Sequence, residues 1–392
     1  MPIFAVRAIR VEKLPPNPKG TAQALQRVGY TLEDALADLI DNSIDANARK
    51  VLLRFFRDST KLTRVAIVDD GGGMDETTLH QAMQFGVQIA HKKHDLGKYG
   101  IGLKTASFSQ CQTLSVFSKQ NGKSNGRRWT LTRMEDDWRC EILDPQASAA
   151  LFQLHWNDVT LDQHGTIVLW EDLDALASGN DIDKVTRKIT KRLPVELGLR
   201  FHRFIADGRL SLQCDVSNFD TAEIAPVIIQ PQDPFGYSHP GRDGYPVTFD
   251  VSLPKRGRLD LEAHIWPAKS ETPEYKLGGG RVAERQGFYF YRNDRLIQGG
   301  GWNLVRESDS EPHSSLARVS IDLSSELDSA FGLTIQKSKV VPPPDFRAQV
   351  LAARCGNTSF DDYITAAVAT YRDGHDEDED ELLVPGLGLP AG

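Results

Sequence analysis

An acid and an amide lie at helical spacing in the segment ALADLIDNSIDA. Asp38 and Asn42 are four residues apart, and Asp45 follows one turn later, so in a helix the three side chains share a face. A carboxylate and an amide on one face can hold a divalent cation through their oxygens and orient a water molecule. The same pattern also occurs on the polar outer face of an ordinary helix, so this segment alone does not establish a site.

A second group of chemically useful residues follows a strand-like run, in the sequence VDDGGGM. Asp69 stands at the end of the run, and Gly71 and Gly73 come directly after it. Glycines permit positive φ and let a flat ligand approach the backbone closely. A carboxylate at this place can accept a hydrogen bond from an exocyclic amine such as that of adenine. The alternative is a glycine-rich turn capped by the aspartate.

The third group is LGKYGIGLKTAS, in which three glycines precede a predicted helix. Gly97, Gly100 and Gly102 would expose successive backbone N–H groups at a helix N-terminus, an arrangement that suits phosphates, and Lys98 and Lys104 add positive charge. As a lone motif it is weak. The sequence contains no GxxxxGK[ST], no GxGxxG after a strand, no HExxH and no GxSxG.

Helices and short strands must position these three groups. Helices are expected at 21–28 and 32–47, the second with its apolar stripe at Leu32, Leu36, Leu39, Ile40 and Ile44 and a start signal at Thr31 and Asp34. Strands are expected in VLLRFF, RVAIVDD, QTLSVFS, RRWTLTR and TIVLWEDL. DETTLHQAMQFG and the segment from Leu103 should be helical, and so should the basic segment 181–204. No βαβα rhythm appears, so we expect an α+β sandwich rather than a doubly wound sheet.

The second half reads as strand-rich from about 210 to 340, and a composition shift near 205–210 marks the candidate domain boundary. Two helices, 344–354 and 360–371, should close the folded part. The predicted segments are an N-terminal segment 1–20, a first domain 21–207, a second strand-rich α+β domain 208–345, C-terminal helices 346–372 and an acidic disordered tail 373–392.

Length and composition agree with a protein of two ordinary domains. The chain has 392 residues, of which 40% are hydrophobic and 26% charged, as in globular proteins. No apolar run is long enough to span a membrane, and the N-terminus lacks a cleavage site, so a cytoplasmic protein is expected. Four scattered cysteines without a CxxC pair argue against a structural zinc site and a disulfide framework.

The net charge of −8 is concentrated in the tail. Six acids run from Asp376 to Glu381, and the rest of the chain has 48 acidic residues against 46 basic ones. Charge therefore gives no argument for nucleic-acid binding by the whole chain and none against a local basic face. One candidate face is DKVTRKITKRLPVELGLRFHR, which could contact DNA phosphates or be an ordinary solvated helix.

In this order, the three groups resemble the N box and the two glycine boxes of the GHKL ATPase superfamily, which includes gyrase, MutL, the ninety-kilodalton heat-shock chaperone, histidine kinases and MORC proteins. HGTIVLWEDL fits as a fourth element, because Gly165 and Thr166 are similar to the late Gly-Thr motif of that superfamily. The resemblance implies that Asp69 binds the adenine amine beside Thr166. It also implies that Gly71, Gly73 and Met74 line the base pocket.

The resemblance also assigns the phosphate side of the site. Asn42 would ligate Mg²⁺ bridging the phosphates of ATP, and the lid over the phosphates would be formed by Gly97, Gly100, Gly102, Leu103 and Lys104. The general base of the family is usually a glutamate four residues before that asparagine. Here the position holds Asp38, which is one methylene shorter, and this departure bears on turnover more than on binding.

The second half places the chain within the superfamily. GFYFYRNDRLIQGGG resembles the YxxRNxR hairpin in the second domain of MutL and MORC proteins. ARVSIDLSSELDSAFGLTIQKSKV resembles the segment that sends a lysine to the γ-phosphate, with Lys337 and Lys339 as the candidates or else a surface-exposed strand end. The overall likeness is to bacterial MORC-like, MutL-related ATPases, over roughly residues 20–345. A histidine kinase is unlikely on sequence grounds, because only 37 residues precede Asp38.

The family resemblance implies an ATP-dependent homodimer that acts on DNA or on a partner protein such as a nuclease or helicase, in some bacterial relatives within restriction or phage-defence operons. Two alternatives stay open. One is a chaperone-like or regulatory module that binds nucleotide with little hydrolysis, and the other is a structural protein whose boxes have decayed. His91 and His94 have HxxH spacing without a third ligand, which favours ordinary lid residues over a metal site.

Overall fold

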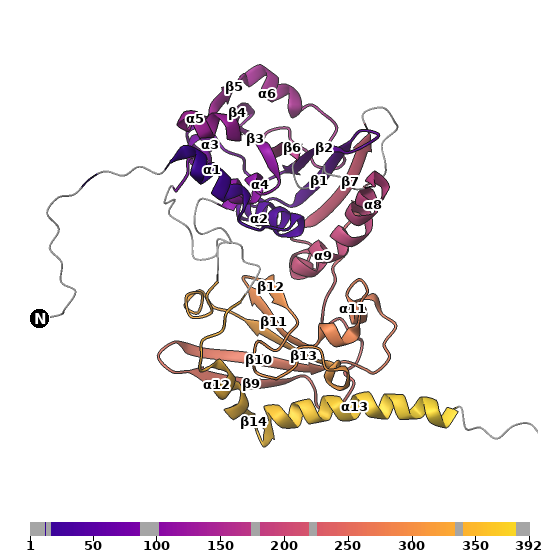
Figure 1. Cartoon of the computed structure of the whole chain (residues 1–392). Helices are drawn as coiled ribbons and strands as arrows, with labels where there is room; N and C mark the ends of the chain where they lie inside the picture. The colour runs from indigo at the N-terminus through magenta and orange to yellow at the C-terminus, as the bar shows by residue number, and fades with distance from the viewer. Residues whose placement is uncertain are drawn as a thin grey trace, which may run out of the picture.

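The computed structural model shows two α+β units joined end to end (Figure 1). It describes residue 12 and residues 17–86, 102–173, 181–218, 226–333 and 340–381. None of the helices in these ranges combines the length and the apolar character needed to cross a membrane.

The first unit is built on an eight-stranded sheet with the order β5-β4-β3-β6-β2-β1-β7-β8. All neighbouring strands are antiparallel except β1 and β7, which run parallel. The strands are β1 Lys50–Arg57, β2 Leu62–Asp69, β3 Cys111–Gln120, β4 Lys123–Thr130, β5 Glu141–Leu143, β6 Gly165–Leu173, β7 Ser211–Asn218 and β8 Val227–Ile228.

The predicted domain boundary at residue 207 is too early in the chain. It assigned β7 to the second domain, but β7 pairs along its whole length with β1, and Leu212, Cys214 and Ile229 belong to the first hydrophobic core. The first unit therefore continues past residue 207 to about Ile229. Composition did not show this because the partner of β7 lies about 160 residues earlier in the chain.

Helices cover one face of the first sheet. These are α1 Pro18–Gln26, α2 Leu32–Asp45, α3 Glu76–Met83, α4 Gly102–Phe108, α5 Leu131–Asp137, α8 Ile182–Arg187, α9 Leu193–Arg200 and α10 His202–Ala206, with a π-helical turn at Lys188–Arg192 between α8 and α9. Thr31 caps α2 by accepting a hydrogen bond from the backbone N–H of Asp34 at 3.1 Å, as its position predicted. The predicted strand RRWTLTR is only half right, because β4 ends at Thr130 and α5 begins at Leu131.

The opposite face of the sheet is partly covered by α6 Pro145–Leu151 and the segment 152–161 that follows it. A buried ion pair fixes this segment, because the guanidinium of Arg54 binds both carboxylate oxygens of Asp215 and also donates to the carbonyl of His155 and to the side chain of Asn157. The middle of β1 is therefore connected to β7 and to the segment over the sheet.

The second unit contains a five-stranded sheet with the order β12-β11-β13-β10-β9. Its strands are β9 Val247–Leu253, β10 Gly257–Ile265, β11 Gly287–Arg292, β12 Arg295–Gly299 and β13 Ala317–Asp322, accompanied by α11 Pro273–Lys276 and the 3-10 turns Val282–Arg285 and Pro312–Ser314. Asn293 and Asp294 join β11 to β12 with φ of 48° and 64°, the backbone that a two-residue hairpin turn requires.

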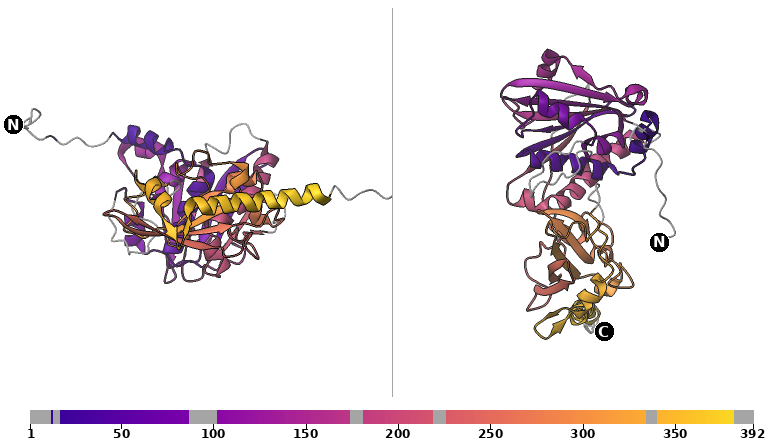
Figure 2. Two further views of the ribbon diagram at one scale, coloured as in Figure 1. Left: turned by 90° about the horizontal axis from the view of Figure 1, so that it is seen from below. Right: turned by 90° about the vertical axis from the view of Figure 1, so that its left-hand side faces the viewer.

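The C-terminal elements lie across the end of the second unit that faces away from the first (Figures 1 and 2). They are α12 Phe346–Ala352, the short hairpin strands β14 Arg354–Cys355 and β15 Thr358–Ser359, and α13 Phe360–Glu381. The predicted disordered tail from 373 is corrected here, since the backbone stays helical through Glu381. Phe360, Tyr363 and Ala367, near the start of α13, are buried in the second core and anchor the helix.

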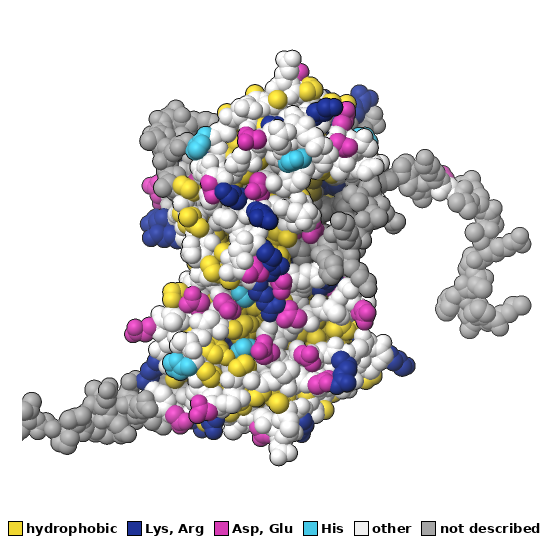
Figure 3. All heavy atoms as spheres, turned by 180° about the vertical axis from the view of Figure 1, so that it is seen from behind, with side chains coloured by type: hydrophobic (Ala, Val, Ile, Leu, Met, Phe, Trp, Pro, Cys, Tyr) yellow, Lys and Arg dark blue, Asp and Glu magenta, His cyan; other side chains and the backbone are white. Residues whose placement is uncertain are grey.

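The two units meet through α2, α9 and α10 on one side and β11, β12 and β13 of the second sheet on the other. Arg203 on α10 lies 3.7 Å from the ring centroid of Tyr291 and donates to Asp322 at 2.6 Å. The Nε2 atom of His202 lies 3.0 Å from the Tyr291 hydroxyl. Figure 3 shows basic and acidic side chains close together where the units join. Several elements of each unit thus contribute to the junction.

Candidate nucleotide-binding site

The side chain of Asp69 lies at the end of β2 and is buried, with 5% of its surface exposed. Its Oδ1 accepts a hydrogen bond from the N–H of Gly71 at 3.0 Å, and its Oδ2 accepts one from the hydroxyl of Ser43 at 3.0 Å. Burial raises the pKa of Asp69 to about 6, although the two hydrogen bonds act in the opposite direction. The carboxylate is thus held in a fixed orientation and is still ionised at neutral pH.

Close backbone packing explains two of the glycines near Asp69. Gly73 has a φ of +66°, and a Cβ at this position would lie 1.8 Å from the carbonyl oxygen of Lys119. A Cβ on Gly165, where φ is +137°, would lie 2.7 Å from the carbonyl oxygen of Asp69. Only glycine fits such positions. These two glycines allow the VDDGGGM segment, β3 and β6 to approach each other directly beside the carboxylate.

Thr166 lies next to Asp69, because these two residues are partners in the antiparallel pairing of β2 with β6. Its hydroxyl is 3.1 Å from that of Ser118, which in turn accepts a hydrogen bond from the N–H of Met74 at 2.7 Å. Met74 is half-buried and packs against the first core. The structure therefore brings together Asp69, Thr166, Met74 and the glycine segment around one place.

The two residues predicted on α2 differ in exposure. Asn42 is exposed, whereas Asp38 is buried with 4% of its surface accessible and accepts a hydrogen bond from the hydroxyl of Tyr30 at 2.8 Å. Ser43 follows Asn42 and binds Asp69. The same helix therefore carries the amide, the acid and the hydroxyl that connects it to the end of β2.

Lys104 is placed differently from the expectation of a cation over phosphates. Its side chain is 1% exposed, and its ammonium donates to the carbonyl oxygens of Ala82 and Gln84 at 2.7 and 2.9 Å. Burial lowers its pKa to about 8. In the structure Lys104 therefore ties the beginning of α4 to the end of α3.

Other predicted residues fall at the edge of the described chain or beyond it. Gly102 and Leu103 open α4 and are half-buried. Gly97, Gly100, Lys337 and Lys339 lie outside the described residues, as do His91 and His94. The assignment of the lid and of the distal lysine therefore stays a prediction.

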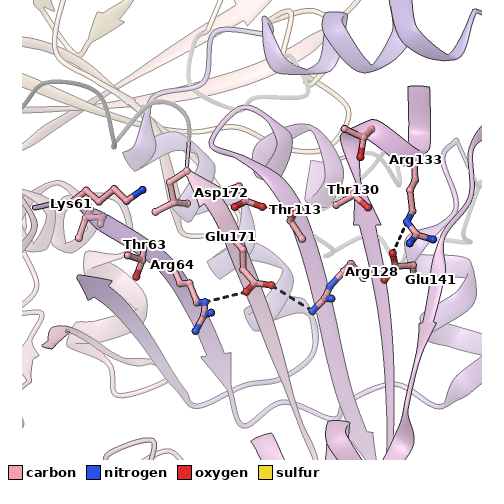
Figure 4. A pocket seen from close by; sticks show the side chains of 13 residues that line it. Lys61, Thr63, Arg64, Thr113, Arg128, Thr130, Arg133, Glu141, Glu171 and Asp172 are labelled. Atoms are coloured by element: carbon pink, nitrogen blue, oxygen red, sulfur yellow. Dashed lines mark hydrogen bonds and ion pairs between the residues drawn. The ribbon is translucent and has the colours of Figure 1, made fainter. Parts of the chain in front are cut away.

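A separate pocket of about 720 Å³ lies on the face of the first sheet that α6 leaves open (Figure 4). Glu171 on β6 is at its centre, 3.1 Å from Arg64 Nε and 3.5 Å from Arg128 Nη2. Glu171 and Thr166 are five positions apart on β6, so their side chains project to opposite faces of the sheet. This pocket is thus distinct from the Asp69 site.

Sequence reasoning gave no role to Ser43, Tyr30 or Arg295, although Arg295 is the last arginine of the YxxRNxR pattern in GFYFYRNDRLIQGGG. Ser43 directly follows Asn42 in the N-box segment, but no motif of the sequence pointed to its hydroxyl. Arg295 lies on β12, yet its Nε donates to Asp41 Oδ1 at 3.1 Å. The residue pattern of one helix cannot show a partner that lies 254 residues away in the chain.

Comparisons with known proteins identify the family to which the part of the chain around this site is similar. Residues 30–166 match the family described as Histidine kinase-, DNA gyrase B-, and HSP90-like ATPase. The match includes α2, Asp69, the glycine segment and Thr166, so this part of the chain is a GHKL-type ATPase domain, as the sequence motifs predicted. Within that superfamily the chain is similar to MORC proteins.

Three relatives illustrate the similarity. Protein MICRORCHIDIA 5 of Arabidopsis thaliana is 27% identical over 157 residues, which cover 35% of this chain and 22% of the relative. ATPase morc-1 of Caenorhabditis elegans is 34% identical over 88 residues, covering 22% and 10%. ATPase MORC2 of Homo sapiens is 29% identical over 115 residues, covering 28% and 11%. The chain thus matches less than a quarter of the length of each.

Among solved structures, the chain is similar to one described as the N-terminal domain of a DNA repair protein. The alignment has a TM-score of 0.47 and 16% sequence identity, and it covers 93% of this chain and 100% of that one.

Proposed function

We propose that the chain binds ATP at the end of β2 and hydrolyses it, as an ATPase of the MORC and MutL type. The observation that carries this proposal is the buried carboxylate of Asp69, which is oriented by Ser43 and Gly71 beside Thr166. A fixed, ionised acceptor next to closely packed glycines is suited to the exocyclic amine of adenine. A glycine-rich turn with a purely structural role would not require such an acceptor.

Hydrolysis requires a water molecule that is oriented and deprotonated next to the γ-phosphate. Asp38 is the proposed general base, because it lies one helical turn before Asn42, and its carboxylate is held by Tyr30. Asn42 is the proposed Mg²⁺ ligand. The described residues contain no cluster of three or more acidic, histidine or cysteine ligands, and this fits Mg²⁺, which commonly takes one or two protein oxygens and completes its shell with phosphates and water. When bound, the ion would neutralise phosphate charge.

We further propose that nucleotide binding drives dimerisation and action on DNA or on a partner protein, with Lys337 or Lys339 reaching the γ-phosphate. The similarity to MORC proteins supports this extension. For DNA, the candidate surface is smaller than the sequence suggested, because Arg200 and Arg203 are engaged in ion pairs with Asp34 and Asp322. The exposed bases that remain are Lys184, Arg187, Lys191 and Arg192, with Lys188 next to Glu33.

Isothermal titration calorimetry and phosphate release test the proposal. The wild-type chain should bind Mg-ATP and release phosphate, Asp38→Ala should bind but not turn over, and Asn42→Ala should lose Mg-dependent binding. Absence of binding heat with folded protein at millimolar Mg-ATP would contradict the nucleotide site itself. Loss of DNA-stimulated turnover on neutralising Lys191 and Arg192 would support the DNA-binding extension, and an unchanged rate would contradict it.

The second candidate is a nucleotide-binding module with little hydrolysis. The short side chain of Asp38 and its burial against Tyr30 favour it, because a shorter arm holds the attacking water at a less favourable distance. Tight ATP binding with equal, near-background phosphate release in the wild type and in Asp38→Ala would identify this alternative.

A further inference from the structure

A buried cluster of polar side chains connects the two units at the acidic side of α2. The hydroxyl of Tyr30 donates to Asp38 Oδ2 at 2.8 Å. From the second unit, Arg295 on β12 donates through Nε to Asp41 Oδ1 at 3.1 Å, and its Nη2 lies 4.0 Å from Asp38 Oδ1. Both units therefore contact the acids of the helix that carries the proposed general base.

Because this cluster is buried, its carboxylates and guanidinium can adopt few relative orientations. Asp38 is 4% exposed, and Asp41 and Arg295 are each 1% exposed. Charges withdrawn from water are stable only in close, well-directed pairs, and the planar guanidinium restricts how a carboxylate can lie against it. Arg295 is held further by Phe201, whose ring centroid is 5.6 Å from its Cζ atom. Reorientation of either acid is thereby restricted.

The state of Tyr30 agrees with a role as a donor. Burial, followed by the negative charge of Asp38, raises the pKa of the Tyr30 hydroxyl above its ordinary value. The hydroxyl therefore stays protonated at neutral pH, and it donates its proton to Asp38 Oδ2.

We propose that Tyr30 and Arg295 are positioning residues for hydrolysis, which hold the carboxylate of Asp38 and the adjacent Asp41 in the orientation that the attacking water requires. The proposal rests on the ATPase function proposed above. It assigns to the second unit a contribution to the base side of the site, in addition to any lysine that reaches the phosphates. Because Asp38 has a short arm, its efficiency depends strongly on this orientation.

The direct test is Tyr30→Phe, which removes one hydroxyl and keeps the ring. Tyr289→Phe is the matched control, since Tyr289 is also buried and donates its hydroxyl to the carbonyl of Arg285 in the second unit at 2.7 Å. We expect Tyr30→Phe to lower kcat by about 10-fold to 10²-fold, the effect of a misplaced catalytic group. The Kd for ATP should stay within about twofold because Tyr30 does not contact Asp69, and Tyr289→Phe should change neither quantity.

Arg295→Lys tests the contribution of the second unit while keeping the positive charge. Its control is Arg203→Lys, which changes another guanidinium at the junction, one that contacts Asp322 and the ring of Tyr291. We expect Arg295→Lys to lower kcat with a nearly unchanged Kd, and Arg203→Lys to affect only thermal stability. Circular dichroism checks that each variant is folded. If Arg295→Lys does not fold, the comparison of Tyr30→Phe with Tyr289→Phe still tests the proposal.

Two results would overturn the proposal by itself. One is wild-type kcat in Tyr30→Phe, and the other is an equal loss of kcat in each variant and its control, which would mean that the groups act only through stability. If the wild type binds ATP but releases no phosphate above background, the proposed hydrolysis fails and this proposal fails with it. The wild-type measurement thus separates the two failures.

Discussion

Replacing Asp69 with asparagine should separate ligand binding from stability. In the wild type the carboxylate receives hydrogen bonds from the N–H of Gly71 and from Ser43. In Asp69→Asn the amide oxygen can keep the bond from Gly71, and the NH₂ group can donate to Ser43. The Ser43 hydroxyl already lies 3.2 Å from the carbonyl oxygen of Leu39, to which it can donate instead. The variant should therefore fold normally.

The effect on ATP binding follows from the loss of a charged acceptor. A hydrogen bond to a charged group contributes ~1.5–3 kcal/mol, which corresponds to an increase of Kd by about 10-fold to 150-fold. In the wild type, binding should also weaken as the pH falls below about 6, the pKa of the buried carboxyl, because the protonated group is a poorer acceptor. The variant should show no such pH dependence from this position.

Asp69→Asn should weaken ATP binding at neutral pH, but it should not lower the stability of the folded protein there. The folded-state pKa of Asp69 is raised from 3.8 to about 6, so between these values the folded state binds more protons than the unfolded state, and stability decreases as the pH rises. Two pKa units correspond to about 3 kcal/mol. Asparagine does not ionise, so the variant does not lose this stability as the pH rises. At pH 7.5 and without ATP, the variant should therefore be at least as stable as the wild type. Its stability relative to the wild type should fall towards pH 4.

Calorimetry at pH 5.5 and 7.5 measures the binding, and urea unfolding over pH 4–8 measures the stability. A Kd within twofold of the wild type would refute the role of Asp69 in binding the base. A difference in unfolding free energy that does not change with pH would refute the raised pKa.

Two further predictions concern the neighbouring elements. Gly73→Ala should lower the free energy of unfolding by at least ~2 kcal/mol in urea titrations, since at its positive φ a Cβ would clash with the Lys119 carbonyl. The control is Gly86→Ala, where φ is +71° and a Cβ would meet nothing within 4 Å; it should lower the free energy of unfolding by only ~1–2 kcal/mol. Equal losses in the two variants would contradict the close packing at Gly73. For Lys104, burial lowers the folded-state pKa to about 8, so wild-type stability should rise between pH 8 and 10.5 relative to Lys104→Met. Parallel stability curves over that range would contradict the burial of its ammonium.

The placement of several residues of the candidate site could be predicted because their signals are local. Asp69 and the glycines after it are consecutive in the sequence, and α2 shows its buried stripe at Leu32, Leu36 and Ile40. The β11–β12 hairpin was also recognisable, since strand residues flank Asn293 and Asp294. In each case the residues that determine the conformation are within a few positions of one another.

Long-range pairing could not be predicted in the same way. The assignment of β7 to the first sheet depends on its parallel pairing with β1, which no local pattern encodes. Lys104 was expected to lie over the phosphates because the resemblance to GHKL ATPases places it in the lid. Its direction depends instead on two carbonyl groups at the end of α3, about twenty residues earlier.

The acids of α2 show how the two kinds of information combine. Helical periodicity puts Asp38 and Asn42 on one face of α2 and Asp41 off that face. In the structure Asp41 is as deeply buried as Arg295, its partner from β12, so the side of α2 next to the proposed base faces the second unit. The same helix contributes Ser43 to the contact with Asp69 and Asp41 to the junction. We therefore expect nucleotide bound at the proposed site to change the relative position of the two units through α2.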